Sequence, residues 1–323
     1  MKPFLLALVL PWLILSCSND QPEEKQLSKI ILMTDWYPQP EHGGFYQALA
    51  QGYYEAEGLE VEIRSGANLM DIRSPVALGQ IDFAIGTSDT TLIGVGRGLP
   101  LVGMFPYFQH DPQCVMFHPE NDIKTLYDLS DRTVMLQSSL SYTEHMIKSL
   151  KIDMNLIPMD YSLARFATDP EFIQQCFVTS EPIHLKKQGV EAKVIMLSES
   201  GFDPYRHIYT SKKTLQTKRA EAEAFTRASI KGWQEFMNGD PTPAFNLIAS
   251  LNQQQTPELM KAGLAAMKKY AIVAGDSSKG ESLGAYQKSR LHAQYQQLDE
   301  LNLLDQSFNV DEYFDLTLLP QSD

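Results

Sequence analysis

The sequence predicts an α/β protein of two lobes, each built on a doubly wound sheet, with a helical C-terminal segment packing on the first lobe. Three observations predict this fold. Strand-like and helix-like segments alternate from Lys29 to Met104, the alternation restarts near Gln113, and the last third of the chain is nearly all helical. A βαβαβ order predicts a parallel sheet with helices on its faces.

The first part of the first lobe is expected over residues 28–112. Leu59 to Ile63 alternates apolar and charged side chains, as a half-buried strand does. Gly79 follows an apolar helical stretch and is placed to end it. The predicted strands cover residues 29–34, 59–63, 81–85 and 99–104, and the predicted helices cover a segment from Phe45 to Tyr53 and residues 69–78 and 88–95.

The second lobe is expected over residues 113–204, with strands at 114–117, 133–136, 172–178 and 192–197 and helices at 141–150 and 182–188. Residues 205–323 return through the hinge and complete the first lobe with helices. Asn238-Gly239 indicates the end of one helix, and Thr256-Pro257-Glu258 the start of another. The chain therefore crosses between the lobes twice, near 111–113 and 204–209, an arrangement suited to closing on a ligand.

The N-terminus has the features of an export leader. Lys2 precedes an apolar run that is too short to span a bilayer, and Ile14-Leu15-Ser16-Cys17 resembles the lipobox of bacterial lipoproteins. The resemblance implies a signal peptide over 1–16, lipidation of Cys17 and a polar tether over 17–27. The mature chain would then sit in the cell envelope, lipid-anchored on the extracytoplasmic side of a bacterial membrane. The alternative is an ordinary signal peptide with an incidental cysteine.

Composition and missing motifs narrow the function. The formal net charge of −13 and the lack of a basic stripe argue against nucleic acid as a partner. The sequence has no HExxH, Walker A, GxSxG or CxxC motif, so we expect no catalytic residue, no metal site and no cofactor. Gly94 to Gly98 follows a helix and precedes a strand, the wrong order for a dinucleotide loop, and reads as a helix stop. Two thiols in an exported chain can form one disulfide, but we expect Cys114 and Cys176 to be buried free thiols.

One resemblance covers nearly the whole mature chain, from about Lys29 to Phe314. Its sharpest part is Asp35 to Tyr46 (DWYPQPEHGGFY) together with Gln51 to Leu59. The segments 79–85, 178–182, 187–189, 232–233 and 240–241 also fit. These residues resemble the NMT1/THI5-like (SsuA/THI5-like) binding proteins, the ABC-importer receptors for thiamine pyrimidine precursors, riboflavin, nitrate and alkanesulfonates.

The resemblance implies a periplasmic-binding-protein fold of type II and a solute-binding protein that delivers a small molecule to ABC permease and ATPase subunits, as a monomer. Asp-Trp followed by Pro-x-Pro-x-His looks most like the thiamine pyrimidine precursor receptors. The chain departs from that branch at Gly43-Gly44 and at Asp169-Pro170-Glu171, which leaves riboflavin, sulfonate or nitrate as alternative ligands.

The candidate ligand-binding residues of the first strand end are Asp35, Trp36, Tyr37 and His42. Open α/β sheets bind ligands at the carboxyl ends of their strands. Trp36 and Tyr37 can stack on a planar heterocycle there, or cap the core. Asp35 can accept from an amino group or from turn amides, and His42 can donate to a ring nitrogen or cap the next helix.

The other candidates stand at helix starts and at the hinge. Thr87-Ser88 and Ser138 can offer hydroxyls to a ligand, or only cap helices. Glu181 is placed well at a helix start by capping alone, but in the resembling pyrimidine receptors it faces the cleft and can pair with an exocyclic amine. Tyr205 can close over a ring or pack in the hinge. Aromatic, hydroxylic and acidic residues without an arginine cluster favour an amine-bearing ring over an anion.

Two other functions remain open. The same family contains pyrimidine synthases that use pyridoxal phosphate and consume an active-site histidine, and those relatives have a cysteine-rich stretch that binds iron. This chain offers only Cys176 there. A lipoprotein that senses a solute and signals to a membrane partner also needs only a closing cleft.

Overall fold

The computed structural model describes residues 26–67 and 71–318. The predicted signal peptide 1–16, the lipidation site Cys17 and most of the tether 17–27 lie outside the described residues. Within the described ranges, no helix combines the length and apolar character needed to span a membrane.

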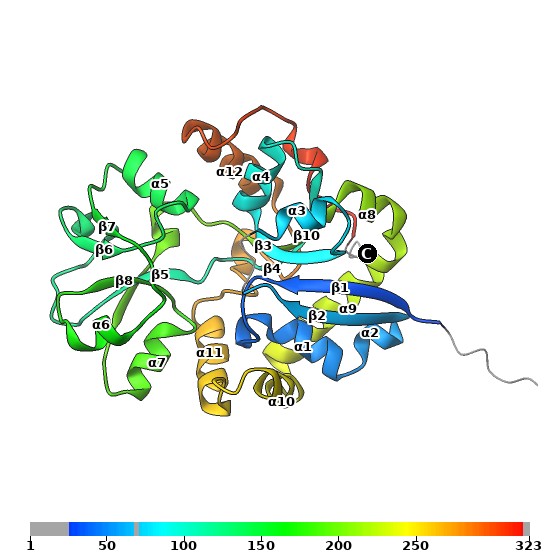
Figure 1. The fold of residues 1–323 in the computed structure, drawn as a ribbon, viewed down its shortest axis with the longest axis horizontal. Helices are drawn as coiled ribbons and strands as arrows, with labels where there is room; N and C mark the ends of the chain where they lie inside the picture. The colour runs from blue at the N-terminus through cyan, green and yellow to red at the C-terminus, as the bar shows by residue number, and fades with distance from the viewer. Residues whose placement is uncertain (1–25, 68–70, 319–323) are drawn as a thin grey trace, which may run out of the picture.

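Two five-stranded sheets form two lobes that lie side by side (Figure 1). The first sheet has the order β2-β1-β3-β10-β4 and the second the order β7-β6-β8-β5-β9. The first contains β1 (Ser28–Thr34), β2 (Leu59–Ser65), β3 (Phe83–Thr87), β4 (Leu101–Phe108) and β10 (Arg206–Ser211). The second contains β5 (Gln113–Phe117), β6 (Thr133–Met135), β7 (Asn155–Ile157), β8 (Ile173–Phe177) and β9 (Lys193–Met196).

The first sheet is mixed, where the strand–helix alternation predicts a parallel one. β1 is parallel to β2 and β3, whereas β10 is antiparallel to both β3 and β4 and lies between them. β4 leads the chain out of the first lobe, and β10 brings it back in the opposite direction. A strand that returns through the hinge must therefore enter this sheet antiparallel.

Helices cover both faces of the first sheet, with α1, α2 and α9 on one side and α3 and α4 on the other (Figure 1). The helices of this lobe are α1 (Gly43–Ala50), α2 (Tyr53–Ala56), α3 (Arg73–Ala77), α4 (Ser88–Gly96), α8 (Lys212–Thr217), α9 (Arg219–Asn238), α10 (Thr242–Leu251) and α12 (Lys288–Glu300). The second lobe carries α5 (Ser141–Lys148), α6 (Ala164–Thr168) and α7 (Glu181–Lys187), and α11 (Pro257–Lys269) lies beside α7.

Residues 69 and 70 of the predicted helix over 69–78 lie outside the described residues, and α3 begins at Arg73. Asp71 accepts hydrogen bonds from the backbone N–H groups of Arg73 and Ser74 at 3.0 and 3.3 Å, which caps the helix and fixes its start. Gly79 follows it with φ of 74°, as a C-terminal glycine does. α4 likewise ends at Gly96, so the glycines around it form a helix stop.

Gly43-Gly44 is explained by helix packing. A Cβ on Gly44 would lie 2.2 Å from the Trp233 ring, and one on Gly232 would lie 2.2 Å from the Gly44 carbonyl oxygen. α1 and α9 therefore touch at these glycines, over a core that includes Phe45 and Trp233, both fully buried. The glycines serve the core of the first lobe rather than a close approach to ligand.

The expectation of free thiols is wrong, because Cys114 and Cys176 form a disulfide. β5 and β8 pair antiparallel and place the two cysteines directly opposite each other, with their Cα atoms 5.0 Å apart. That separation lies within the usual range for a disulfide. The pairing of β5 with β8 joins residues far apart in the sequence, so no local pattern indicates it.

The segment that follows α11 forms hydrogen bonds to the first crossing between the lobes. The backbone N–H groups of Gln109 and His110 donate to the Ile272 carbonyl at 2.7 and 3.1 Å. His110 also contacts Asp203 through Nδ1 at 2.6 Å and Glu281 through Nε2 at 3.0 Å. The segment after α11 is thus tied to the first crossing, next to the candidate site.

Candidate functional site

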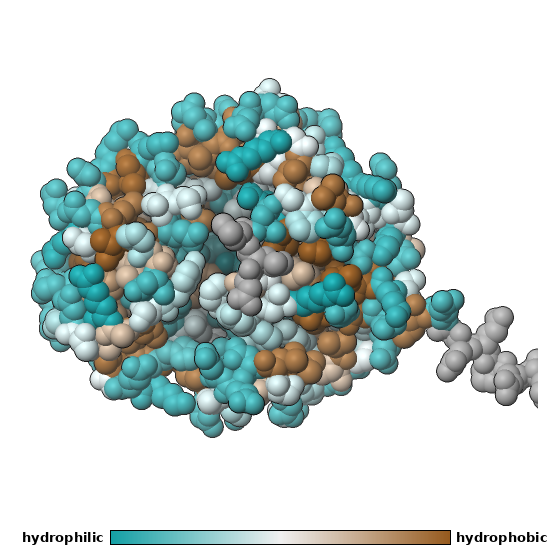
Figure 2. All heavy atoms as spheres, viewed as in Figure 1, coloured by the Kyte–Doolittle hydropathy of each residue, from teal (hydrophilic) through white to brown (hydrophobic). Residues whose placement is uncertain are grey.

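The candidate site lies between the lobes, at the carboxyl ends of β1, β3 and β8. The surface is hollowed along this line (Figure 2). Asp35, Trp36 and Tyr37 follow β1 directly, so the structure brings three of the predicted residues to one edge of the first sheet. Ligands bind at this edge in open α/β sheets.

The aromatic part of the site spans both lobes. Trp36 and Tyr37 are 36% and 44% exposed, so both rings are accessible to a ligand that would stack on them. Trp36 also meets Tyr161, from the segment between β7 and α6 of the second lobe, with ring centroids 5.3 Å apart. Tyr161 was not predicted, because nothing in its local sequence indicates that it crosses the cleft.

Tyr161 is held in an unfavourable backbone conformation. Its φ is 60°, in the left-handed region that a bulky side chain seldom adopts. Such conformations cost about 1–3 kcal/mol and cluster at ligand clamps and switch regions. Tyr161 is therefore a functional candidate on its backbone geometry as well as on its contact with Trp36.

Asp35 is the centre of a charged network. His42 Nε2 lies 2.9 Å from Asp35 Oδ1, and the Arg206 guanidinium donates to Asp35 Oδ2. Burial alone would raise the pKa of Asp35, but the Arg206 charge and the hydrogen bonds from His42 and Arg206 outweigh it and hold the pKa well below its usual value. Asp35 is thus a carboxylate at neutral pH.

The structure places His42 behind Asp35 rather than on the cleft wall. Its side chain is 1% exposed, and its Nε2 is directed at the carboxylate. Because that contact fixes Asp35 in place, His42 orients the carboxylate that follows β1. Its role as a direct ligand donor, one of the two predicted possibilities, has less support from this geometry than the orienting role.

Arg206 is the main site residue that sequence reasoning missed. It opens β10, is 7% exposed, and lies between Asp35 and Asp111, with its Nε 3.4 Å from the Asp111 carboxylate. Its guanidinium stacks 4.8 Å from the centre of the Phe177 ring in the second lobe. Its position beside the second crossing is the one local signal that it belongs to the site.

The negative charge of Asp111 is less well stabilised by its neighbours than that of Asp35. Burial raises its pKa to about 6, and the charge of Arg206 lowers it only in part. The two carboxylates share one guanidinium, so this wall of the cleft carries more negative than positive charge.

The predicted hydroxyl residues lie in different surroundings. Thr87 ends β3 and is paired in register with Arg206, and its Oγ1 is 2.9 Å from Thr90 Oγ1. The Ser88 hydroxyl is buried, donates to Gln294 at 2.5 Å and accepts from the Tyr205 N–H at 3.0 Å. Ser138 is exposed in the turn before α5.

Tyr205 is part of the hinge packing. It is 1% exposed, its hydroxyl accepts from the Gln287 N–H at 3.1 Å, and the Arg290 guanidinium lies 4.0 Å from its ring centre. The structure therefore joins Ser88 and Tyr205 to each other at the hinge, not to the aromatic residues near Trp36.

Glu181 starts α7 and accepts from the Phe177 N–H at 2.7 Å. Burial raises its pKa to about 7, with a further contribution from the charge of Glu41 in the first lobe. Glu41 itself accepts a hydrogen bond from the Thr179 hydroxyl, so the two lobes are bonded directly at this point. A cavity of about 10 Å³ beside them is lined by Glu41, Thr179 and His184 among others, which is room for one water.

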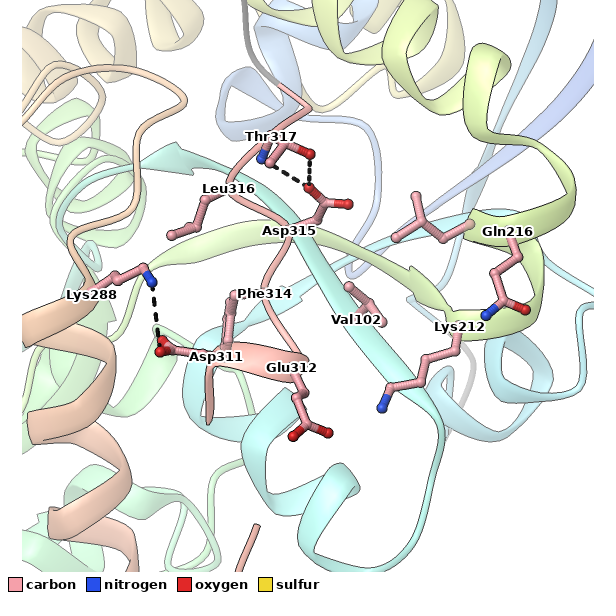
Figure 3. A pocket seen from close by; sticks show the side chains of 11 residues that line it. Val102, Lys212, Gln216, Lys288, Asp311, Glu312, Phe314, Asp315, Leu316 and Thr317 are labelled. Carbon is pink, nitrogen blue, oxygen red and sulfur yellow. Dashed lines mark hydrogen bonds and ion pairs between the residues drawn. The ribbon is translucent and has the colours of Figure 1, made fainter. Parts of the chain in front are cut away.

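A larger cavity of about 640 Å³ lies on the first lobe away from the cleft (Figure 3). Val102, Phe314 and Leu316 are among its apolar lining residues. Its charged side chains bond to their neighbours, Lys288 with Asp311 at 3.6 Å and Asp315 with Thr317. This cavity is not the candidate ligand site, because its lining has neither exposed aromatic side chains nor carboxylates that lack a bonding partner. Over the described residues, no group of His, Cys, Asp and Glu side chains is arranged to hold a metal ion.

Two known proteins are similar to this chain over most of its length. The formylaminopyrimidine-binding protein of Halalkalibacterium halodurans is 24% identical over 269 residues, 79% of this chain and 81% of that protein. The 4-amino-5-hydroxymethyl-2-methylpyrimidine phosphate synthase of Legionella pneumophila is 20% identical over 310 residues, 91% of this chain and 93% of that protein.

Among solved structures, the periplasmic aliphatic sulphonate binding protein SsuA from Escherichia coli matches with a TM-score of 0.67 at 11% identity, over 92% of this chain and 95% of that one. The predicted type II periplasmic-binding-protein fold is thereby confirmed. A family model described as "NMT1/THI5 like" matches residues 39–244, more than half of the chain. The chain therefore belongs to the NMT1/THI5-like family.

Proposed function

We propose that this chain is an extracytoplasmic solute-binding lipoprotein of an ABC importer, and that it binds a heteroaromatic amine resembling a thiamine pyrimidine precursor. The observation that carries the proposal is the pairing of exposed aromatic rings with two carboxylates, one half-buried and one buried, at one cleft. Trp36 and Tyr161 offer flat faces from opposite lobes, and Asp35 and Asp111 supply negative charge beside them. The formylaminopyrimidine-binding relative agrees with such a ligand.

The charge balance argues against an anionic ligand. A sulfonate or nitrate needs a cation or several N–H donors. At the described cleft wall the Arg206 guanidinium is engaged by two carboxylates, so an anion would have to compete with both. The amino group of a heteroaromatic ring instead offers N–H donors to an acidic wall. Riboflavin, sulfonate and nitrate are therefore the weaker alternatives.

Two independent features support export, and the first of them also supports anchoring. The leader and Cys17 resemble those of bacterial lipoproteins, and the Cys114–Cys176 disulfide suits an oxidising compartment outside the cytoplasm. The partners would be the permease and ATPase subunits of the importer, with the chain acting as a monomer. A sensing lipoprotein would use the same cleft and would differ in its membrane partner.

The second candidate function is pyrimidine synthesis from pyridoxal phosphate and an active-site histidine. Similarity to the Legionella synthase over most of both chains favours it. The position of His42 disfavours it, because the ring is buried and its Nε2 faces Asp35. Incubation with pyridoxal phosphate and iron, followed by mass spectrometry of the protein, tests the alternative. A mass loss confined to the peptide containing His42 would support the synthase.

A calorimetric screen of the domain that starts after Cys17 tests the receptor proposal. The panel holds formylaminopyrimidine, hydroxymethylpyrimidine, thiamine, riboflavin, pyridoxal phosphate, taurine and nitrate. A ligand at a hundred times its Kd stabilises the fold by about 2.7 kcal/mol, which a thermal-shift assay detects. Binding of a pyrimidine alone is the expected result, and binding of only an anion would overturn it.

A further inference from the structure

Asp89 is a buried acid with an unused oxygen. It lies in the first turn of α4, is 4% exposed, and its Oδ1 has no hydrogen-bond partner among the described residues. Most buried polar atoms in native proteins have a partner, and leaving one unsatisfied costs about 1–3 kcal/mol. Capping does not account for this side chain, because the Thr87 and Thr90 side chains already form the capping box of α4.

Tyr142 repeats this situation in the other lobe. It lies in the first turn of α5, is 6% exposed, and its hydroxyl has no hydrogen-bond partner within the described part of the chain. Burial raises its pKa well above the usual value of 10, and the charges of Asp111 and Asp89 raise it further. The phenol therefore stays protonated and has a hydroxyl to offer.

The two helix starts face the same segment of the hinge. Ser88, next to Asp89, exchanges hydrogen bonds with the backbone of Tyr205 at 2.9 and 3.0 Å. One turn beyond Tyr142, His145 Nε2 lies 3.0 Å from the Ser200 carbonyl. α4 and α5 thus flank residues 200–205 from opposite lobes, as the ribbon also shows (Figure 1), and the Asp89 carboxylate lies near enough to Tyr142 for its negative charge to raise the pKa of the phenol.

We infer that Asp89 and Tyr142 form a two-lobed polar clamp at the inner end of the cleft, which binds the amino group of the ligand. The inference rests on the proposed receptor function and adds to it the residues that recognise the amino group of the ligand. A carboxylate oxygen can only accept, so Asp89 selects an N–H donor, and a cationic or amidine-like one most strongly. The Tyr142 hydroxyl then accepts from the second N–H or donates to a neighbouring ring nitrogen.

The clamp also ties recognition to closure. A ligand shifts the balance between open and closed lobes only by as much as it binds one state better. A group that bonds Asp89 and Tyr142 together contacts both lobes at once, and this is possible only when they are closed. An analogue that lacks the amino group leaves both side chains unsatisfied in the closed form and is rejected for that reason.

Isothermal titration of two ligands against three proteins tests the clamp. The ligands are 4-amino-5-hydroxymethyl-2-methylpyrimidine and the same ring with hydrogen in place of the amino group. Wild-type protein is expected to prefer the amino compound by tenfold or more. Asp89→Asn, which keeps size but loses charge, is expected to weaken binding of the amino compound roughly tenfold to a hundredfold. Tyr142→Phe is expected to weaken it by about fivefold.

The control variants are Asp122→Asn and Tyr127→Phe, two exposed side chains of the second lobe, which should leave both affinities unchanged. Unfolding midpoints establish whether each variant folds. If Asp89→Asn does not fold, Tyr142→Phe, which removes only one oxygen, still tests the clamp. Wild-type binding of the amino compound with unchanged preference in both clamp variants overturns the clamp and leaves the receptor standing. Wild-type protein that binds neither pyrimidine overturns both.

Discussion

Trp36 and Tyr161 lie against each other across the two lobes, with ring centroids 5.3 Å apart and ring planes tilted by 38°. Trp36 follows the first strand of one lobe, and Tyr161 belongs to a loop of the other. A flat ring inserted between them would need them to move apart, since stacked rings lie about 3.5 Å from each neighbour. We therefore propose that the pair acts as an aromatic gate, whose faces become ligand contacts when the lobes readjust.

Replacement of Trp36 by Ala should weaken ligand binding strongly and leave the fold intact. Stacking of a heterocycle on an aromatic side chain is worth about 1–3 kcal/mol, so the Kd should rise roughly tenfold to a hundredfold. Trp36 is partly exposed, so the free energy of unfolding should change by less than about 1 kcal/mol. Calorimetry with the best pyrimidine of the panel, together with urea unfolding, measures both quantities.

Tyr161→Asn provides the matched comparison. Asn tolerates the left-handed backbone at this position, so the variant removes the ring without adding strain. We expect weaker binding and equal or greater stability. An affinity unchanged in both Trp36→Ala and Tyr161→Asn would show that the ligand does not stack at the gate.

The site residues that follow a predicted strand can be located from the sequence. The residues that join them from distant parts of the chain cannot. Asp35, Trp36 and Tyr37 follow a recognisable strand, and their position at its carboxyl end follows from fold class alone. Tyr161 and Arg206 join them through long-range packing. No residue pattern near either one specifies which side chains of the other lobe or strand they contact, and the Cys114–Cys176 pairing is hidden for the same reason.

His42 shows a second limit of prediction from sequence, which is the direction of a side chain. Its residue type indicates a role in binding or catalysis, but its 2.9 Å contact with Asp35 makes it a support for that carboxylate. Sequence gives the chemistry that a side chain is capable of. The direction in which the side chain points decides which part of that chemistry is used.

Arg206→Met should destabilise the protein by about 3–5 kcal/mol. The substitution removes the cation that the buried Asp111 and the half-buried Asp35 share, and an unpaired buried charge carries a penalty of this size. Urea unfolding at neutral pH measures it. The matched control is Arg227→Met, which breaks an exposed ion pair with Glu57 and should cost less than about 1 kcal/mol.

A double variant separates charge from packing at Arg206. In the Asp35→Asn background one of the two carboxylates is already neutral, so Arg206→Met should cost less there than in the wild type. Equal costs in the two backgrounds would show that lost packing, not unpaired charge, dominates.

Glu181 should make the protein less stable as pH rises from about 4.5 to about 7. Its pKa is 4.5 in the unfolded chain and about 7 in the folded one, so between these values the folded state binds more protons than the unfolded state. The free energy of unfolding then falls with rising pH and levels off above 7. A shift of this size corresponds to at most about 3.5 kcal/mol.

Glu181→Gln isolates this contribution. Gln cannot titrate but keeps an oxygen to accept from the Phe177 N–H, so the difference in stability between variant and wild type should grow with pH between 4.5 and 7 in favour of the variant. Urea unfolding at pH 5, 6 and 7 measures it, with the exposed Glu171→Gln as the control. A difference that stays constant with pH would mean that Glu181 does not titrate in this window.

Loss of the disulfide should lower the stability of the domain by about 2–4 kcal/mol. Cys114 and Cys176 are 62 residues apart in the sequence; closing a loop of this size restricts the unfolded chain by about 4 kcal/mol, and measured disulfide contributions are typically about 2–4 kcal/mol. The double variant Cys114→Ala/Cys176→Ala should therefore match the stability of reduced wild type and should not respond to reductant.

Thiol titration of the denatured, unreduced domain that starts after Cys17 should find no free thiol, since both cysteines are bonded. Two reactive thiols in protein isolated from the cell envelope would contradict the disulfide and remove one of the two supports for an exported receptor.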